Sequence, residues 1–482
     1  MPFTLNAGGI TRKNEVALKR RARSAARPSA GSAVAAVQLP SSADLRRIAE
    51  KILRLSGADE TEVSLDTGAD ALTRFANNVI HQNVAQEFLS ISVRTVFDGR
   101  TARATTNKTD DESLRRVVAA SSTLARCQPK IPDLLPMPGM QKYAKTERFF
   151  EATAAATPQD RARVVALVCE TAEKLRETSA GIYSTGAARS VLANSNGLFA
   201  EHEQTSAEFS VTMMGGDSSG WAKANAPDIS ALDPVALAER ATQKSVLSRA
   251  PRELPPGRYT VILEPAAVLD LVGFLFYDFA GTAVLDRRSC LNERIGKQIF
   301  GRNINLWDDA AHPMQLGAPF DGEGMPRQRV KLVDAGVPKN LVYSRATAKK
   351  MKAKPTGHSL ALPSEWGEAP LNLVLDGGKA SLDAMIGSTD RGILVTRVWY
   401  VREVDPYEKI LTGMTRDGTF LIEGGRVAHG IRNFRFNESM LEMLSNVETL
   451  GAAVRASGEE AFEMVVPPMK IRDFHFTEIT KF

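Results

Sequence analysis

The stretch LVGFLFYDFAGTAVLDRRS, residues 271–289, decides how this chain is interpreted. Most of its residues are apolar, yet Tyr277 and Asp278 stand side by side in it, and Thr282 follows the tyrosine by five residues. The preceding residues LPPGRYTVILEP, 254–265, predict a turn, a strand and a proline in the first turn of a helix. We therefore expect a strand–proline–helix unit whose buried helix carries polar groups at a fixed spacing.

The residues before this unit alternate between helical and extended patterns. DLRRIAEKILRL (44–55) has apolar residues at helical spacing, and alternating segments follow it up to residue 107, with a tight turn at Asp98-Gly99. Further helices are predicted over 110–127, 158–175 and 233–247, with more strands between the last two. QPKIPDLLPMPGM (128–140) has too many prolines for a long helix or a central strand.

After residue 289, glycine and proline punctuate many short strands up to the end of the chain. The predicted fold class is α+β, an N-terminal α/β domain plus a C-terminal domain of mostly antiparallel sheet. A chain of 482 residues is too long for one core. The expected parts are a disordered basic tail (1–40), an N-terminal α+β domain (41–127), a proline-rich linker with a central α+β domain (128–250), and a mostly-β domain (254–482).

The positive net charge is confined to the N-terminal tail. Residues 1–40 hold seven basic side chains and one acid, which gives +6, so the total of +5 leaves the rest of the chain at −1. The folded part therefore lacks the basic excess that phosphate neutralisation needs, which argues against nucleic-acid binding. A targeting segment or a nucleic-acid arm are the alternatives to a disordered tail.

The compartment is predicted from cysteine usage and hydropathy. The three cysteines, Cys127, Cys169 and Cys290, are odd in number and far apart, which fits a reducing compartment. No stretch reaches the roughly 18 apolar residues of a membrane-spanning helix. The expected location is cytoplasmic, with no membrane partner.

Several motifs could carry chemistry on their own. Asp308, Asp309 and His312 in DDAAHP could ligate a metal, but a solvated turn is the simpler interpretation. Asp321 and Glu323 in PFDGEGMP each precede a glycine, which favours turn chemistry. Cys290 follows two arginines, but no histidine base is close in sequence.

Several stretches together resemble the TldD/PmbA (TldE) peptidase family. RFANNVIHQN and LSISVRTVFDGRTARATTN resemble its N-terminal domain. GRYTVILEPAAVLDLVGFL, DRRSCLNERIGKQIF, LWDDAAHP, APFDGEGMPRQRVKLVDAGV, PTGH and DRGILVTRVWYVREVDPYEKILTGMTRDGTFLIEGGRV resemble its C-terminal domain. The resemblance covers about residues 44–460 in the order of the family.

The resemblance implies a zinc motif that this chain has lost. In catalytic members the helix after the strand and proline carries HExxxH, where the histidines bind zinc, the glutamate can act as base, and a C-terminal cysteine completes the site. The six positions here are Tyr277, Asp278, Phe279, Ala280, Gly281 and Thr282, and no cysteine follows Cys290. Tyr and Thr hydroxyls are poor zinc ligands. We therefore expect neither metal nor cofactor in this chain, and Tyr277 and Thr282 as core hydrogen-bonding groups; a zinc site would need other ligands, such as His358 or His429.

Three hypotheses about function follow. The first, implied by the resemblance to the PmbA/TldE branch, is the metal-free subunit of a heterodimeric peptidase that cuts unfolded or leader peptides, with zinc in a TldD-like partner. Its sheet edges would bind extended peptide through main-chain hydrogen bonds, with 391–402 and 412–423 as candidate edges. The second is a stand-alone hydrolase using Asp278 with Asp321, or Cys290. The third is a non-enzymatic binding or modulator protein, including the gyrase-related role in the family's older naming.

Overall fold

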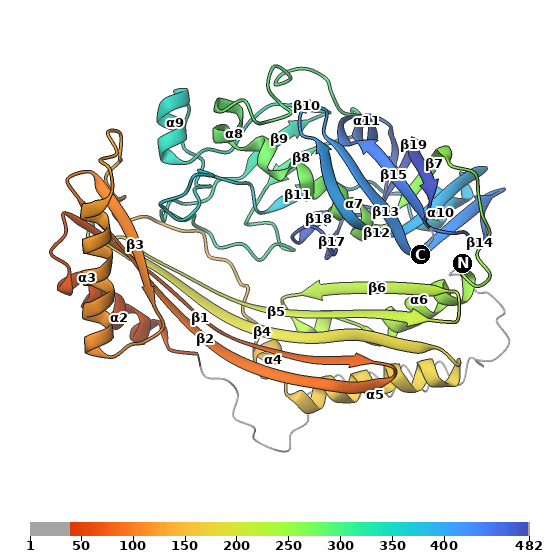
Figure 1. Ribbon diagram of the computed structural model, residues 1–482, viewed down its shortest axis with the longest axis horizontal. Helices are drawn as coiled ribbons and strands as arrows, with labels where there is room; N and C mark the ends of the chain where they lie inside the picture. Colours follow the sequence, from red (N-terminus) through yellow and green to blue (C-terminus); the bar gives the residue numbers. More distant parts are fainter. Residues whose placement is uncertain (1–38, 481–482) are drawn as a thin grey trace.

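The computed structural model describes residues 39–480, so nearly all of the predicted basic tail over 1–40 lies outside the described residues. The N-terminal half is built on one six-stranded antiparallel sheet, with the order β3-β2-β1-β4-β5-β6. Its strands are β1 (Glu60–Ala76), β2 (Val79–Phe97), β3 (Arg100–Thr106), β4 (Thr178–Asn194), β5 (Phe199–Met214) and β6 (Ser219–Ala226). Figure 1 shows β1, β2, β4 and β5 as long, bent strands.

Helices cover the two ends of this sheet. α2 (Ser42–Leu55) and α3 (Asp111–Cys127) lie at one end, and α5 (Pro158–Lys174) lies on the face turned away from the C-terminal half (Figure 1). α5 begins with a capping box between Thr157 and Asp160, which satisfies amide groups that the first turn leaves free. The remaining helices of this half are α4 (Glu151–Ala154), a 3₁₀ turn (Ile229–Ala231) and α6 (Pro234–Leu247).

The long sheet crosses the boundary that the sequence predicted near residue 127. β1 pairs with β4 along its length, from Glu62 opposite Asn194 to Phe75 opposite Gly181. The predicted N-terminal and central parts therefore share one sheet, although each end has its own core. Val63, Leu65 and Ile91 belong to the core under α2 and α3, whereas Phe75 and Phe209 belong to the one under α5 and α6.

A small closed barrel forms the centre of the C-terminal half. Its strands follow the order β12-β7-β19-β15-β13, and β13 also pairs with β12, which closes the ring. β14 extends β13, and β16 pairs with β19. These strands are β7 (Gly257–Leu263), β12 (Arg391–Asp405), β13 (Ile410–Glu423), β14 (Arg426–Gly430), β15 (Phe434–Ser439), β16 (Val447–Leu450) and β19 (Met469–Ile479).

A second sheet of short strands lies beside the barrel, with the order β10-β9-β8-β11-β18-β17. Its strands are β8 (Leu306–Asp308), β9 (Val330–Asp334), β10 (Val337–Pro338), β11 (Leu373–Leu375), β17 (Val454–Ala456) and β18 (Met464–Val466). The helices of this half are α7 (Pro265–Val272), α8 (Gly281–Leu285), α9 (Arg345–Met351), α10 (Leu382–Gly387) and α11 (Met440–Ser445). The predicted class, α+β with a mostly antiparallel C-terminal half, is confirmed.

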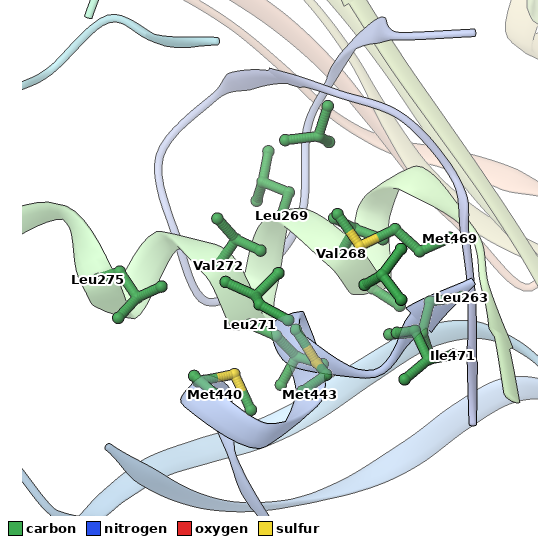
Figure 2. Packing of buried hydrophobic residues seen from close by; sticks show 14 of the residues in the cluster. Leu263, Val268, Leu269, Leu271, Val272, Leu275, Met440, Met443, Met469 and Ile471 are labelled. Atoms are coloured by element: carbon green, nitrogen blue, oxygen red, sulfur yellow. The ribbon is translucent and has the colours of Figure 1, made fainter. Parts of the chain in front are cut away.

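α7 is the centre of the largest core. Figure 2 shows Val268 beside Met469, and Leu271 beside Met440 and Met443. These side chains have essentially no exposed surface, so α7 is fixed by packing on the barrel and on α11. The strand–proline–helix unit is thus a rigid support for the residues that follow it.

The structure corrects two expectations. The opening stretch is not one helix: α7 ends at Val272, a 3₁₀ turn covers Gly273–Phe279, and Ala280 is extended. The chain turns there because Gly281 donates to the Val342 carbonyl at 2.9 Å. The prediction of a free edge at 412–423 is also wrong, because β13 is flanked by β12 on one side and by β14 and β15 on the other.

Glu438 of β15 should make the stability of the fold depend on pH. It is buried, and this burial raises its pKa to about 7, although its carboxylate accepts the His475 amide at 2.8 Å. A carboxyl whose folded pKa is raised costs stability when ionised, so this cost grows as the pH rises from about 4.5 to about 7. We expect Glu438→Gln to raise the free energy of unfolding by about 2 to 3 kcal/mol at pH 8 and by little at pH 4. Urea unfolding at both pH values measures this, with exposed Glu423→Gln as control; an equal effect at both would contradict it.

Candidate functional site

Tyr277 and Thr282 contact the same loop. Tyr277 lies in the 3₁₀ turn before the extended residue Ala280, and Thr282 lies in α8 after it. The Tyr277 hydroxyl donates to the Trp366 carbonyl at 3.3 Å, and the two rings meet edge to face at 4.7 Å. Thr282 donates from both its amide (2.6 Å) and its hydroxyl (3.0 Å) to Glu368 Oε1. The segment 366–368 therefore covers these two motif positions.

Glu368 was not anticipated from the sequence, although it organises this side of the site. Its carboxylate is fully buried, and Oε2 accepts the Ser344 amide at 3.1 Å at the start of α9. No cation lies within ion-pair distance of it among residues 39–480. Its charge is instead stabilised by backbone and hydroxyl donors, including Thr282. A glutamate followed by Ala-Pro in a loop gives no periodic or motif signal, so only the structure reveals it.

Asp278 points away from Tyr277 and Thr282 and enters a different network. Its Oδ1 accepts the Cys290 amide at 2.8 Å, and its Oδ2 pairs with Lys409 Nζ at 2.6 Å. Lys409 also pairs with Glu403 of β12. Burial by itself would lower the pKa of Lys409, but these two carboxylates raise it above its ordinary value. Asp278 is thus a structural anion that joins the 3₁₀ turn to the β12–β13 hairpin.

The residues at the motif positions do not fit zinc. Asp278 forms an ion pair with Lys409, and Glu368 accepts three hydrogen bonds. The Tyr277 hydroxyl donates to the Trp366 carbonyl, and the Thr282 hydroxyl donates to Glu368. Hydroxyl ligands are also poor substitutes for imidazole on this metal. Across residues 39–480, no group of three or more histidine, cysteine or acidic side chains is arranged to hold a metal ion.

The other acidic candidates are used in turns or buried pairs. Asp321 accepts the amides of Glu323, Met325 and Ser359 at 2.9 Å each, which is the turn chemistry expected from its glycine neighbours. Its burial raises its pKa, as it does for Glu323, which pairs with Arg345 at 3.2 Å. Asp321 and Asp278 thus bind different groups and form no acid pair.

Asp308 and Asp309 of DDAAHP bind different partners, and the His312 ring accepts the Met314 amide at 3.3 Å. Asp308 is fully buried against His358, with Oδ1 to Nε2 at 2.9 Å, whereas Asp309 pairs with the Arg329 guanidinium at 3.1 Å. Although burial alone would raise the pKa of Asp308, hydrogen bonding from His358 holds it below its usual range. The other ring nitrogen of His358 bonds to Thr356, so both nitrogens are engaged. His429 lies elsewhere, on β14, against its neighbour's carbonyl.

A cavity of ≈ 370 Å³ lies where α9 meets the N-terminal sheet. It is lined by Arg94 of β2, by Ile131 and residues 133–135 of the linker, by α9 and by the loop 362–364. Ser344, the N-cap of α9, donates to Glu368, and Thr347 within α9 bonds to Thr282. Thr282 and this cavity therefore lie against the same short helix.

Cys290 is a poor nucleophile in this setting, and we predict its thiol to be unreactive. It is fully buried, and that burial, together with the nearby Asp278, raises its pKa. Cys169 is also buried with a raised pKa, whereas Cys127 is exposed. A thiol reagent at pH 7 should modify one cysteine per native chain, and all three after denaturation. Rapid labelling of Cys290 in the native chain, mapped by mass spectrometry with Cys127→Ser as control, would contradict this.

Comparisons with known proteins match three consecutive regions of the chain. Models of the PmbA/TldA metallopeptidases match domain 1 at residues 61–125, the central domain at 139–249 and the C-terminal domain at 256–478. These three matches together cover most of the chain. It belongs to the PmbA/TldD metallopeptidase family.

Curated relatives are distant. A metalloprotease of Methanothermobacter thermautotrophicus is 26% identical over 233 residues, 45% of this chain and 48% of that protein. The metalloprotease PmbA of Escherichia coli O157:H7 is 24% identical over 236 residues, 47% and 49% of the two chains. The alignment thus spans about half the length of these relatives.

Two solved structures share the fold. TldE from Thermococcus kodakarensis superposes with a TM-score of 0.82 at 20% identity, covering 90% of this chain and 100% of that one. A Thermotoga maritima protein described as a candidate modulator of DNA gyrase gives 0.81 at 19% identity, with the same coverage. Within residues 39–480, no helix has both the length and the apolar character needed to cross a membrane.

Proposed function

We propose that this chain is the metal-free subunit of a two-chain peptidase in the reducing cytoplasm, and that a TldD-like subunit supplies the zinc. The proposal depends on which residues stand at the six positions 277–282 and on the contacts that they make. Tyr277, Asp278 and Thr282 replace the metal-binding and basic residues, and the structure commits each of them to the protein's own groups. A site whose polar atoms are engaged in this way offers neither metal ligands nor a free base.

The chain's role in this proposal is to shape the peptide-binding surface. An extended peptide is recognised by main-chain hydrogen bonds to a strand edge, which requires no particular side chain. β12 pairs with β7 only through Val395, so its distal part has no strand on that side, although the Tyr400 amide donates to the Glu460 carboxylate there. The likeness to TldE supports the fold of such a subunit, and the partner supplies the catalytic chemistry.

The alternative of a stand-alone hydrolase is less well supported. Cys290 is buried with a raised pKa, and Asp278 and Asp321 bind separate partners. The third hypothesis is a non-enzymatic modulator. This chain shares its fold with the Thermotoga maritima protein, but a shared fold does not specify a modulator activity.

The proposal is tested by mixing. The purified chain, a purified TldD-like chain from the same organism, and their mixture are each incubated with an unstructured peptide, and products are identified by mass spectrometry. We expect no cleavage by this chain alone and chelator-sensitive cleavage by the mixture well above that of the partner alone. Chelator-resistant cleavage by this chain alone, or a partner whose rate does not change on mixing, would overturn the proposal.

A further inference from the structure

The long N-terminal sheet has two edges, and one of them is covered by the protein itself. On the β6 side, Ser219 donates to Asp417 of β13 at 2.7 Å, and Lys223 reaches the Gly458 carbonyl at 2.9 Å. Beyond the end of β6, the edge of β5 receives the linker, where the Thr205 amide donates to the Arg148 carbonyl at 2.9 Å. The C-terminal half and the linker thus close this edge.

The opposite edge is open over most of β2. β3 pairs with β2 only from Ile91 to Phe97, so residues 79–90 have a neighbouring strand on one side alone. Within residues 39–480, no backbone hydrogen bond outside the sheet reaches them, and none of these twelve residues is buried. This segment, VIHQNVAQEFLS, is called the β2 edge below.

The outward backbone groups of the β2 edge can be assigned from the neighbouring hairpin. Phe97 faces Arg100 across the two-residue turn Asp98-Gly99, so Phe97 exchanges its hydrogen bonds with β3. Alternation along the strand then turns residues 89, 87, 85 and 83 outward and residue 88 toward β1. In agreement, the Phe88 carbonyl accepts the Thr67 hydroxyl of β1 at 3.1 Å.

The β2 edge lacks the usual protection of an exposed strand. It contains no proline, lysine or arginine, and its one register shift, opposite Arg74 and Phe75, lies at the hairpin end. Val79 and Phe88 are exposed by 62% and 39%. Proteins blunt open edges with charges, prolines or bulges because such edges pair with other chains. An unprotected edge of this length therefore points to a strand that normally pairs there.

We propose that the β2 edge is where the partner chain docks, by adding the equivalent strand of its own sheet in antiparallel register. This inference rests on the proposed function, which supplies a partner of the same family. TldE from Thermococcus kodakarensis superposes over its whole length on this chain, so it has the same long sheet. We expect the same sheet in a partner of the same family. Two such edges would cap each other and continue the sheet across both subunits.

The charges of the β2 edge are compatible with a partner strand of the same kind. His81 and Glu87 are its only ionisable side chains, so a strand laid alongside meets almost no fixed charge. Recognition would then come from backbone groups and from covering Val79 and Phe88. The outward amides of Ala85 and Glu87 lie in the middle of this ladder.

The test replaces one outward amide. Ala85→Pro removes a donor that faces away from β1, whereas Ala85→Ser keeps it, and Gln82→Lys/Gln86→Lys adds edge lysines on exposed side chains. Affinity for the TldD-like chain is measured by analytical ultracentrifugation, after thermal melts show that each variant is folded. We expect Ala85→Pro and the double lysine variant to weaken binding on the order of tenfold or more, and Ala85→Ser to bind like the parent.

The outcomes separate this inference from the proposed function. If the parent chain binds the TldD-like chain and both edge variants bind equally well, the β2 edge is not the interface, although the partner role stands. If the parent chain does not bind it at all, the proposed function fails. Self-association of this chain alone that Ala85→Pro abolishes would overturn the partner assignment, because the occupant would then be a second copy.

Discussion

Replacing Asp278 with alanine is expected to lower the free energy of unfolding by about 3 to 5 kcal/mol. The substitution leaves buried Lys409 with only the partly exposed Glu403 as a carboxylate partner, and it frees the Cys290 amide inside the core. Removing the buried partner of a buried ammonium costs far more than an exposed ion pair gains. Chemical denaturation of the purified variant measures the loss.

Two further variants distinguish this structural role from a catalytic one. Asp278→Leu combined with Lys409→Met should recover much of the stability, because both charges leave together. Asp286→Ala, which removes an exposed carboxylate paired with Arg288, should cost about 0.5 kcal/mol or less. Full stability of Asp278→Ala together with loss of peptide cleavage in the two-chain mixture would contradict a structural Asp278.

A loss of similar size is expected for Glu62→Gln in the N-terminal sheet. Glu62 is buried and pairs with Arg94 at 2.9 Å and with Arg103 at 2.6 Å. Neutralising it leaves two guanidinium groups facing each other, so we expect about 3 to 5 kcal/mol of destabilisation at pH 7. Arg103 also donates to the Leu362 carbonyl at 2.8 Å, so the loop around Leu362 should loosen as well.

The pH dependence of Glu62→Gln follows from the pKa of this carboxyl. Burial by itself would raise the pKa of Glu62, but Arg94 and Arg103 lower it below 4.5. The stability from this carboxylate is therefore present above pH 4.5 and is lost as the pH falls through the lowered value. Unfolding curves between pH 7 and pH 3 should converge for the parent and Glu62→Gln, while exposed Glu50→Gln follows the parent throughout. Parallel curves would contradict this.

Much of the fold could be predicted because local patterns agree with the final structure. The apolar spacing in 44–55 and the Asp98-Gly99 turn correspond to α2 and to the β2–β3 hairpin, since both signals depend on neighbours in sequence. The single helix over the opening stretch was wrong because apolar content does not reveal the pairing of Ala280 with Val342. The edge at 412–423 was wrong because closure of the barrel depends on contacts far apart in sequence.

The site was predictable only in part, for a related reason. The positions of Tyr277, Asp278 and Thr282 follow from the strand, the proline and the spacing of the motif. Each of their partners, Lys409, Trp366 and Glu368, is at least 86 residues away in sequence and carries no motif of its own. Buried charge networks of this kind are set by tertiary packing, so they appear only once the chain is folded.

The most direct test of the central claim is the zinc content of the chain purified alone, without metal added or chelator present, measured by elemental analysis. We predict far less than one zinc per chain, unchanged by Tyr277→Phe or Thr282→Ala, and one zinc per heterodimer once the TldD-like chain is bound. One zinc per isolated chain, lost on replacing His358 or Asp278, would contradict the claim and place a metal site in this subunit.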